Sequence, residues 1–320
     1  MSNIAPIVLF VYNRPYHTKK TVEALLRNEY ASESELIIFA DGPKDNATEK
    51  DKKNICATRE YCHSICGFKN VIIHEAAHNK GLDPSEIDGI SQIVNEYGRV
   101  IVLEDDLITN KYFLRFMNEA LEFYEDNKRI FQIAGFVDNI RFPKYFMRKH
   151  SIWVSYRVES CGWATWKDRW EKNQWNEAKY DIIKNPNRSK IRKFNRGGED
   201  LYDQLLSKYR GETDAWDIRW QHCLYENDAL CIRPIYSFLY NIGFDGTGIH
   251  SGNVDLSKIL EQTAPLFDET QYNLKLENNI QIDDNVQHRL RQFFKIHRIN
   301  FWMYCKRKVK KMLTCKIKIN

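Results

Sequence analysis

Three consecutive carboxylates, Glu104, Asp105 and Asp106, come directly after the apolar run 100–103. Like charges this close repel one another and require a positive partner. A divalent cation that also binds a diphosphate supplies one, and oxygen ligands favour Mn²⁺ or Mg²⁺ over zinc. Such a cation would neutralise a nucleotide diphosphate as it leaves a sugar. The alternative is a solvated acidic turn before the next helix, whose N-terminus favours negative charge.

Two further polar residues follow apolar runs nearer the start of the chain. Arg14 comes after the run 7–11, where a guanidinium can meet a base or a phosphate. Asp41 comes after the run 36–39, where a carboxylate can accept a hydrogen bond from a base N–H or a ribose hydroxyl. Each is equally explained as a surface turn residue when taken alone. Together they gain support from sharing a sheet edge with the acidic triplet.

Carboxylates are interspersed with tryptophans in residues 212–220. An acceptor hydroxyl that attacks a sugar needs a base to take its proton. Asp217 is the candidate and Asp214 is its rival, because aromatic walls can raise the pKa of a carboxylate toward that task. Asp214 also suits helix capping, whereas Asp217 is expected one turn inside a helix over 213–225. The choice between the two stays open.

Residues 243–252 contain four glycines, which is too many for regular structure. Such a loop could close over a bound donor and exclude water. His250 would then contact a phosphate of the donor. A plain surface loop fits the composition equally well.

The elements that must position these side chains alternate along the first 140 residues. Apolar runs that indicate buried strands occur at 7–11, 36–39, 71–73, 100–103 and 130–136, and helical patterns separate them. This alternation predicts an α/β fold with a mixed, mostly parallel central sheet flanked by helices. Ligands bind beyond the carboxyl ends of such strands. The groups that follow the first, second and fourth runs are therefore expected on one edge.

Aromatic residues become frequent after residue 142. We expect Trp163 and Trp216 to contact a saccharide acceptor, because a ring face packs on the apolar face of a pyranose. Core packing is the ordinary alternative for any single ring. A loop is expected at 185–196 and a helix at 199–208.

The length and composition of the chain limit the classes of protein to which it can belong. With 320 residues and 43% hydrophobic residues, the chain is long enough for one large domain or two small ones. The eight cysteines include no C-x-x-C pair, which argues against zinc or a disulfide scaffold. The first ten residues show no basic segment of a secretory signal, and no apolar stretch approaches the roughly 20 residues that span a bilayer. A cytoplasmic protein is expected.

Basic residues gather at the C-terminal end. Ten Lys or Arg and no Asp or Glu lie between Arg291 and Asn320, and subtracting these ten from the net charge of +5 leaves −5 for the rest. Apolar and aromatic residues precede the cluster 306–311, which predicts a basic amphipathic helical tail on an anionic membrane surface. Nucleic acid competes for any basic run. The body offers no basic stripe, so no nucleic-acid partner is expected; a merely solubilising tail is the third alternative.

Ordered blocks between residues 5 and 253 resemble the GT-A glycosyltransferases, most closely those like the eukaryotic N-acetylglucosaminyltransferase I. The matching blocks are Tyr12-Asn13-Arg14-Pro15, the acidic stretch 102–107 with Tyr112-Phe113 after it, the glycine–tryptophan stretch 160–166, Trp216-Asp217, and the stretches 231–234 and 243–252.

The resemblance implies a GT-A (Rossmann-like) fold, an inverting mechanism, a UDP-sugar donor and Mn²⁺. It implies Asp106 as the direct metal ligand, Arg14 and Asp41 near the uridine, and Asp217 as the base. Glu104, Asp105 and His250 complete the expected donor-binding set. The family's luminal members carry an N-terminal membrane anchor, which we do not expect in this chain, and the spacing between Trp216 and Trp220 also differs from the family's. Donor sugar and acceptor therefore do not carry over.

These patterns together predict a hexosyl- or N-acetylhexosaminyltransferase. Residues 1–140 would bind the nucleotide sugar, 141–260 would form the acceptor-binding and catalytic half, and 261–320 would form an extension with the basic tail. The tail suggests a bacterial enzyme of surface glycan biosynthesis. It would act on a saccharide or lipid-linked saccharide at the inner face of the cell membrane.

Three other classes of protein compete with this prediction. A sugar-1-phosphate nucleotidyltransferase uses a similar sheet and metal, but it normally has a Gly-rich loop after its first strand, and residues 13–16 contain no glycine. A catalytically silent carbohydrate-binding protein would not need the acidic triplet. A metal phosphohydrolase would usually add histidine ligands.

Overall fold

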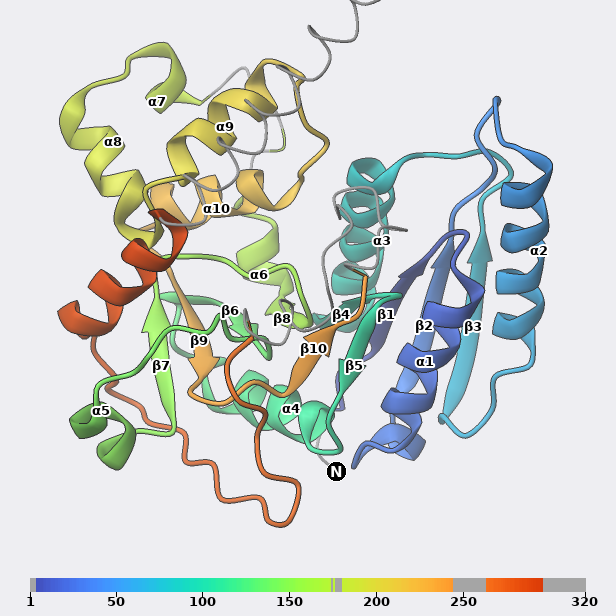
Figure 1. Cartoon of the computed structure of the whole chain (residues 1–320), viewed down its shortest axis with the longest axis horizontal. Helices are drawn as coiled ribbons and strands as arrows, with labels where there is room; N and C mark the ends of the chain where they lie inside the picture. Colours follow the sequence, from blue (N-terminus) through green and yellow to red (C-terminus); the bar gives the residue numbers. More distant parts are fainter. Residues whose placement is uncertain (1–3, 174, 176–179, 244–262, 296–320) are drawn as a thin grey trace, which may run out of the picture.

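The computed structural model describes residues 4–173, 175, 180–243 and 263–295. An eight-stranded sheet has the order β3-β2-β1-β4-β8-β6-β9-β7, and β10 pairs with β5 in a small second sheet (Figure 1). The strands are β1 (Ile7–Val11), β2 (Glu35–Ala40), β3 (Asn70–Glu75), β4 (Arg99–Glu104), β5 (Leu107–Thr109), β6 (Ile130–Ala134), β7 (Ile152–Ser155), β8 (Trp163–Trp166), β9 (Leu230–Pro234) and β10 (Leu239–Asn241).

Helices connect the strands and cover the sheet. In the first half they are α1 (Pro15–Leu26), α2 (Glu49–His63), α3 (Leu82–Tyr97) and α4 (Phe113–Phe123), with a short 3₁₀ turn η1 (Ala31–Glu33). In the second half they are α5 (Lys144–Lys149), α6 (Lys167–Trp170), α7 (Asp181–Lys184), α8 (Arg188–Phe194), α9 (Leu201–Tyr209) and α10 (Asp217–Glu226), with the 3₁₀ turn η3 (Asn195–Gly197). A further helical segment covers residues 284–295.

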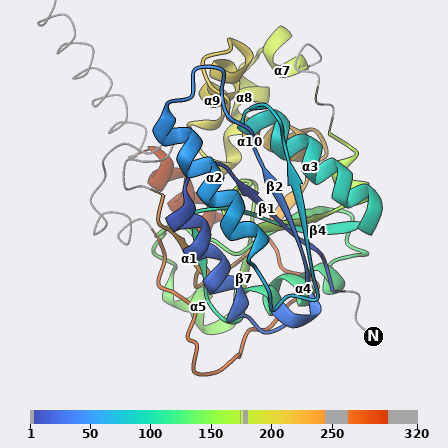
Figure 2. The ribbon, with the colours of Figure 1, turned by 90° about the vertical axis from the view of Figure 1, so that its right-hand side faces the viewer.

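Strands β3, β2, β1 and β4 are parallel to one another, and β6 is parallel to β9. The pairs β4–β8, β6–β8 and β7–β9 are antiparallel. Helices α1 and α2 cover one face of the parallel strands and α3 covers the other (Figure 2). The predicted α/β fold, with a mixed and mostly parallel sheet between helices, is confirmed.

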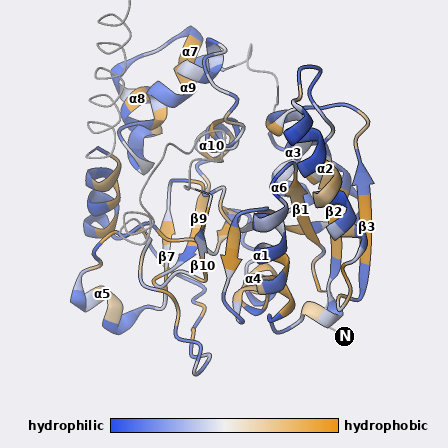
Figure 3. Ribbon diagram, turned by 45° about the vertical axis from the view of Figure 1, so that its right-hand side comes forward, coloured by the Kyte–Doolittle hydropathy of each residue, from blue (hydrophilic) through white to orange (hydrophobic). Residues whose placement is uncertain are grey.

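Alternate residues of β1 enter two different cores. Ile7 and Leu9 pack in the core that contains residues of α1 and α4, whereas Val8 and Phe10 pack in the core that contains residues of α3. Because both faces are covered, the strand is apolar at every position. Figure 3 shows the same distribution, with hydrophobic colour in the central strands and hydrophilic colour along the outer helices.

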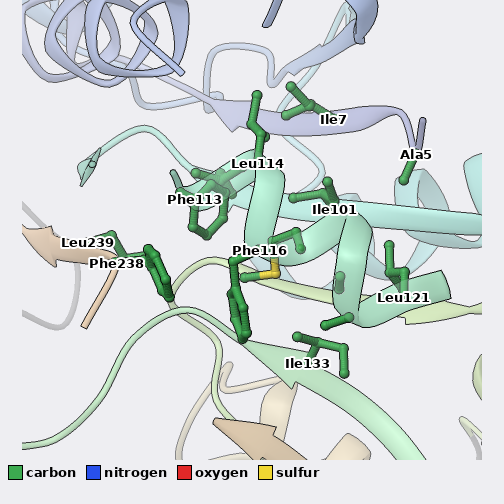
Figure 4. Packing of buried hydrophobic residues seen from close by; sticks show 14 of the residues in the cluster. Ala5, Ile7, Ile101, Phe113, Leu114, Phe116, Leu121, Ile133, Phe238 and Leu239 are labelled. Atoms are coloured by element: carbon green, nitrogen blue, oxygen red, sulfur yellow. The ribbon is translucent and has the colours of Figure 1, made fainter. Parts of the chain in front are cut away.

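Helix α4 links the two parts of the sheet. Its apolar side chains pack in one core with Ile7 of β1 and Ile133 of β6 (Figure 4). Phe116 of α4 also stacks on Phe238, with ring centroids 4.8 Å apart. One hydrophobic core thus contains residues from both sides of position 140. The predicted division of the chain at 140 and 260 stays a prediction.

Two predicted elements were wrong in detail. Residues 185–196 contain α8 instead of a loop, because Asn187 caps the helix by accepting from the Lys190 N–H at 2.9 Å and Phe194 is buried in a satellite core. Helix α10 begins at Asp217 and not at 213, so Asp217 is the first helical residue.

Some predicted features lie outside the described residues. These are His250 with the glycine-rich loop beyond Gly243, and the tail from residue 296. Among the helices that the structure does describe, none is long and apolar enough to cross a membrane.

Candidate active site

A cleft of about 340 Å³ lies at the carboxyl ends of β1, β2 and β4. Parallel strands bring segments that are far apart in the sequence to the same sheet edge, where ligands bind. The predicted site residues that line the cleft are Arg14, Asp41, Glu104, Asp105, Asp106 and Asp214. The convergence expected from the strand pattern is therefore present.

Among the described residues, one guanidinium forms ion pairs with the acidic triplet inside this cleft. Asp105 and Asp106 are only 3% and 6% exposed. Arg14 forms an ion pair with Asp105, and its Nη1 lies 3.0 Å from Oδ2 of Asp106. One positive charge thus faces three neighbouring carboxylates.

The electrostatics of the triplet reflect this imbalance. Burial, together with the nearby carboxylates of Asp106 and Asp105, raises the pKa of Glu104 to about 8. Burial also raises the pKa of Asp105 to about 6, although Arg14 opposes the change. Burial disfavours the charge of Arg14, but Asp105 and Asp106 outweigh this effect and raise its pKa. The site holds more acid than it neutralises, which favours a bound cation.

The carboxylate of Asp41 holds a neighbouring loop. Oδ1 accepts from the backbone N–H groups of Gly42 and Lys80, both at 2.8 Å, and Oδ2 accepts from Asn79 Nδ2 at 2.8 Å and the Gly81 N–H at 3.1 Å. A carboxylate has about four acceptor positions, so all of them are used. The contact to a base or ribose that the sequence suggested would have to displace one of these bonds.

The end of β10 closes the cleft beside Asp106. The backbone N–H of Ile242 donates to the Asp106 carbonyl oxygen at 2.8 Å, and Asn241 Nδ2 lies 3.3 Å from Asp106 Oδ1. Gly243 packs so closely that a Cβ there would lie 2.0 Å from Asp106 Oδ2. The close approach explains why the glycine-rich stretch begins at this position.

Asp106 is suited to hold a divalent cation. Mg²⁺ is usually bound by one or two carboxylates together with substrate phosphates and water, and Mn²⁺ shares its preference for oxygen ligands. Asp106 offers such a carboxylate on the cleft wall, within a group that carries excess negative charge. Within the described part of the chain no three His, Cys, Asp or Glu side chains form a complete cage. A cation here would take its remaining ligands from phosphate and water.

The two candidate bases differ in their place: Asp214 lines the cleft, whereas Asp217, at the start of α10, is not among the described residues that line it. Asp214 is exposed and lines the cleft. Asp217 is half-buried at the first position of α10, and its charge contributes to the raised pKa of Glu104. Both carboxylates are therefore near the acidic triplet, and both remain candidates.

The two tryptophans expected to contact an acceptor are part of the core. Trp163 and Trp216 are 0% and 3% exposed, and their stacked rings have centroids 5.5 Å apart. Trp170 and Trp220 pack against them, in the same core as residues of α3. Their surroundings indicate a packing role, and neither is among the described residues that line the cleft.

Several lining residues were not among those predicted. Asn79 and Ser85 flank the start of α3, and Asn241 ends β10. Asn79 follows the third apolar run. Like Asp41, it therefore lies at the carboxyl-end edge of the sheet, where ligands bind. Asn241 is the last residue of a strand of only three residues, which is too short for a recognisable alternating pattern.

The similarity of the chain to known proteins is low. No protein-family model and no curated protein sequence matches the chain. The chain is similar to the crystal structure of S. aureus TarS, with a TM-score of 0.42, 11% sequence identity, and an overlap of 80% of this chain and 42% of that chain. The chain thus spans less than half of the length of that protein.

Proposed function

We propose that this chain is an inverting, metal-dependent glycosyltransferase that moves a sugar from a UDP-sugar to a saccharide hydroxyl. One observation carries the proposal. The half-buried Glu104 and the buried Asp105 and Asp106 line a cleft at the carboxyl ends of three parallel strands, where one guanidinium among the described residues forms ion pairs with Asp105 and Asp106. This arrangement suits a divalent cation and a diphosphate together.

The residues around the triplet would bind the donor. Asp106 would hold Mn²⁺ or Mg²⁺, and this cation would neutralise the charge of the departing diphosphate. The planar donors of Arg14 suit phosphate oxygens, which would compete with Asp105 and Asp106 for the guanidinium. The loop held by Asp41 would form the wall against the nucleoside.

The chemical step needs a base on the acceptor side. Asp217, or Asp214 in its place, would take the proton of the acceptor hydroxyl. The hydroxyl oxygen then bonds to the anomeric carbon as the bond to the diphosphate breaks, and the configuration inverts. The proposed setting, bacterial surface glycan synthesis on a free or lipid-linked saccharide at the inner membrane face, is supported by the ten basic residues of 291–320.

A transfer assay with a panel of UDP-sugars and saccharide acceptors tests the proposal. With Mn²⁺ we expect a glycosylated acceptor whose new linkage is inverted, as read by NMR. Asp217→Asn and Asp214→Asn form a matched pair, and the variant that loses the base should retain donor binding while its turnover falls at least a hundredfold.

Other products would identify the competing functions. Formation of UDP-sugar from UTP and a sugar 1-phosphate, with release of pyrophosphate, would show a nucleotidyltransferase. Binding of saccharide with neither transfer nor donor hydrolysis would show a silent binding protein. Either outcome overturns the proposed function.

A further inference from the structure

A buried carboxylate links the start of α3 to both α9 and α10. Asp83, in the first turn of α3, is 8% exposed. Its Oδ2 lies 2.5 Å from Nζ of Lys208 in the last turn of α9, and 2.5 Å from Nη2 of Arg219 in the first turn of α10. A single oxygen therefore binds two cations that come from two different helices.

The same turn of α3 also builds the cleft. Gly81, Leu82 and Ser85 line it, whereas Asp83 contacts α9 and α10. Because the turn is shared, the Asp83 junction fixes where α9 and α10 lie relative to the donor side of the cleft. A buried cation that loses its carboxylate partner is strongly disfavoured, so the junction resists separation.

Arg219 and Lys208 belong to helices with different relations to the proposed base. Arg219 lies two residues after Asp217, in the same helical turn, and its Nη1 also donates to the carbonyl oxygen of Trp175 at 3.2 Å. Lys208 belongs to α9, which contains none of the proposed catalytic residues.

A second buried acid of α3 shows where Asp217 lies. Glu86, one turn after Asp83, is buried, and burial raises its pKa well above the usual range. The carboxylates of Glu104 and Asp217 add to this increase. The charge of Asp217 thus acts on α3 as well as on the acidic triplet, and the ion pair of Arg219 with Asp83 brings the start of α10 against α3.

We propose that Asp83 is a positioning residue: through Arg219 it fixes the start of α10 and so holds the carboxylate of Asp217 on the side of the acidic triplet. The inference rests on the proposed function, because it takes Asp217 as the base. Lys208 stabilises the same junction without placing a catalytic group.

Arg219→Gln and Lys208→Gln form a matched pair for the test. Each removes one cation from the same oxygen of Asp83, so both should lower the unfolding temperature by a similar amount. Only Arg219→Gln should lower kcat, by at least tenfold, with the donor KM unchanged within twofold, because misplacement of a reacting group slows the chemical step. Arg219→Lys, which keeps the charge, should recover part of that loss and serves if Arg219→Gln does not fold.

Hydrogen exchange of the peptide 217–226 gives a readout that needs no substrate. We expect faster exchange in Arg219→Gln than in Lys208→Gln, each compared with the wild-type chain. Equal losses of kcat in the two variants, or equal exchange of α10, overturn the positioning role. If the wild-type chain transfers no sugar, the proposed function fails, and the exchange comparison then decides whether Asp83 fixes α10.

Discussion

Gly243 lies so close to the carboxylate of Asp106 that a methyl group on its Cα would stand 2.0 Å from Asp106 Oδ2. The same methyl group would lie 3.1 Å from Nη1 of Arg14. The backbone after β10 is thus packed onto the ion pair at the centre of the site. Only a residue without a side chain allows this approach.

Gly243→Ala should therefore displace the proposed metal ligand. We expect the Mn²⁺ concentration for half-maximal transfer to rise at least tenfold, measured by metal titration of the rate. Asn241→Ala is the control, because it removes the 3.3 Å contact to Asp106 without adding atoms. Its effect should be smaller, and equal effects of the two variants would contradict the steric explanation.

Arg14→Gln should make the protein more responsive to a divalent cation. The variant leaves Glu104, Asp105 and Asp106 without their counter-charge, so we expect a lower unfolding temperature in the absence of metal. Mn²⁺ should then stabilise the variant more than the wild-type chain, because the cation supplies the missing charge. Thermal unfolding across a Mn²⁺ series, with NaCl at matched ionic strength as control, measures this. The same Mn²⁺ shift in both proteins would argue against a cation at the triplet.

Asp41→Asn tests the loop-holding role of this carboxylate. An asparagine side chain has one acceptor oxygen, so about half of the four hydrogen bonds are lost. At about 1–3 kcal/mol for each unsatisfied group, we expect the free energy of unfolding to fall by about 2–6 kcal/mol. The donor KM should rise more than kcat falls. Native stability combined with lost donor binding would instead indicate that Asp41 contacts the nucleoside directly.

The stability of the protein should fall in mild acid because of His222. Its ring in α10 stacks on Tyr180 with centroids 4.1 Å apart, and burial lowers its pKa to about 4. The unfolded imidazole takes up a proton near pH 6.5, so between these values the unfolded chain binds more protons. This contribution to stability is fully present above about pH 6.5 and decreases as the pH falls, by at most about 1.4 kcal/mol per unit.

His222→Gln should remove that component of the pH dependence. The carboxylate of Glu226, 3.5 Å from His222 Nε2, favours a charged ring and moderates the effect. We therefore expect the loss of unfolding free energy between pH 7 and pH 5 to be about 1–2 kcal/mol smaller in the variant. Urea unfolding at the two pH values measures it. Equal losses in variant and wild type would show that the ring is protonated in the folded protein.

The parallel half of the fold could be predicted because its signals are local. Strand β1 is an unbroken apolar run since both of its faces are buried. Helix α2 begins after Thr48 because Thr48 and Asp51 form a capping box, which is a local sequence signal. Because the carboxyl ends of parallel strands meet at one edge of the sheet, the strand pattern also predicted that Arg14 and Asp106 lie close together.

The remaining features depend on contacts that no local pattern shows. Helix α8 has a basic, loop-like composition, and Phe194 anchors it in a core built from distant segments. A tryptophan such as Trp163 can face a sugar or another ring, and only the packing of α3, α6 and α10 decides between these. Asp83 and Lys208 are 125 residues apart, so their pairing leaves no signal in either segment.

Calorimetric titration of UDP into the protein, with and without Mn²⁺, tests most directly whether the acidic triplet holds a cation beside a sugar nucleotide. We expect Mn²⁺ to strengthen UDP binding at least tenfold in the wild-type chain and in Asp126→Ala, an exposed carboxylate outside the cleft. Asp106→Ala should bind UDP with the same affinity whether or not Mn²⁺ is present. Equal strengthening by Mn²⁺ in Asp106→Ala, or none in the wild-type chain, would contradict the proposed site.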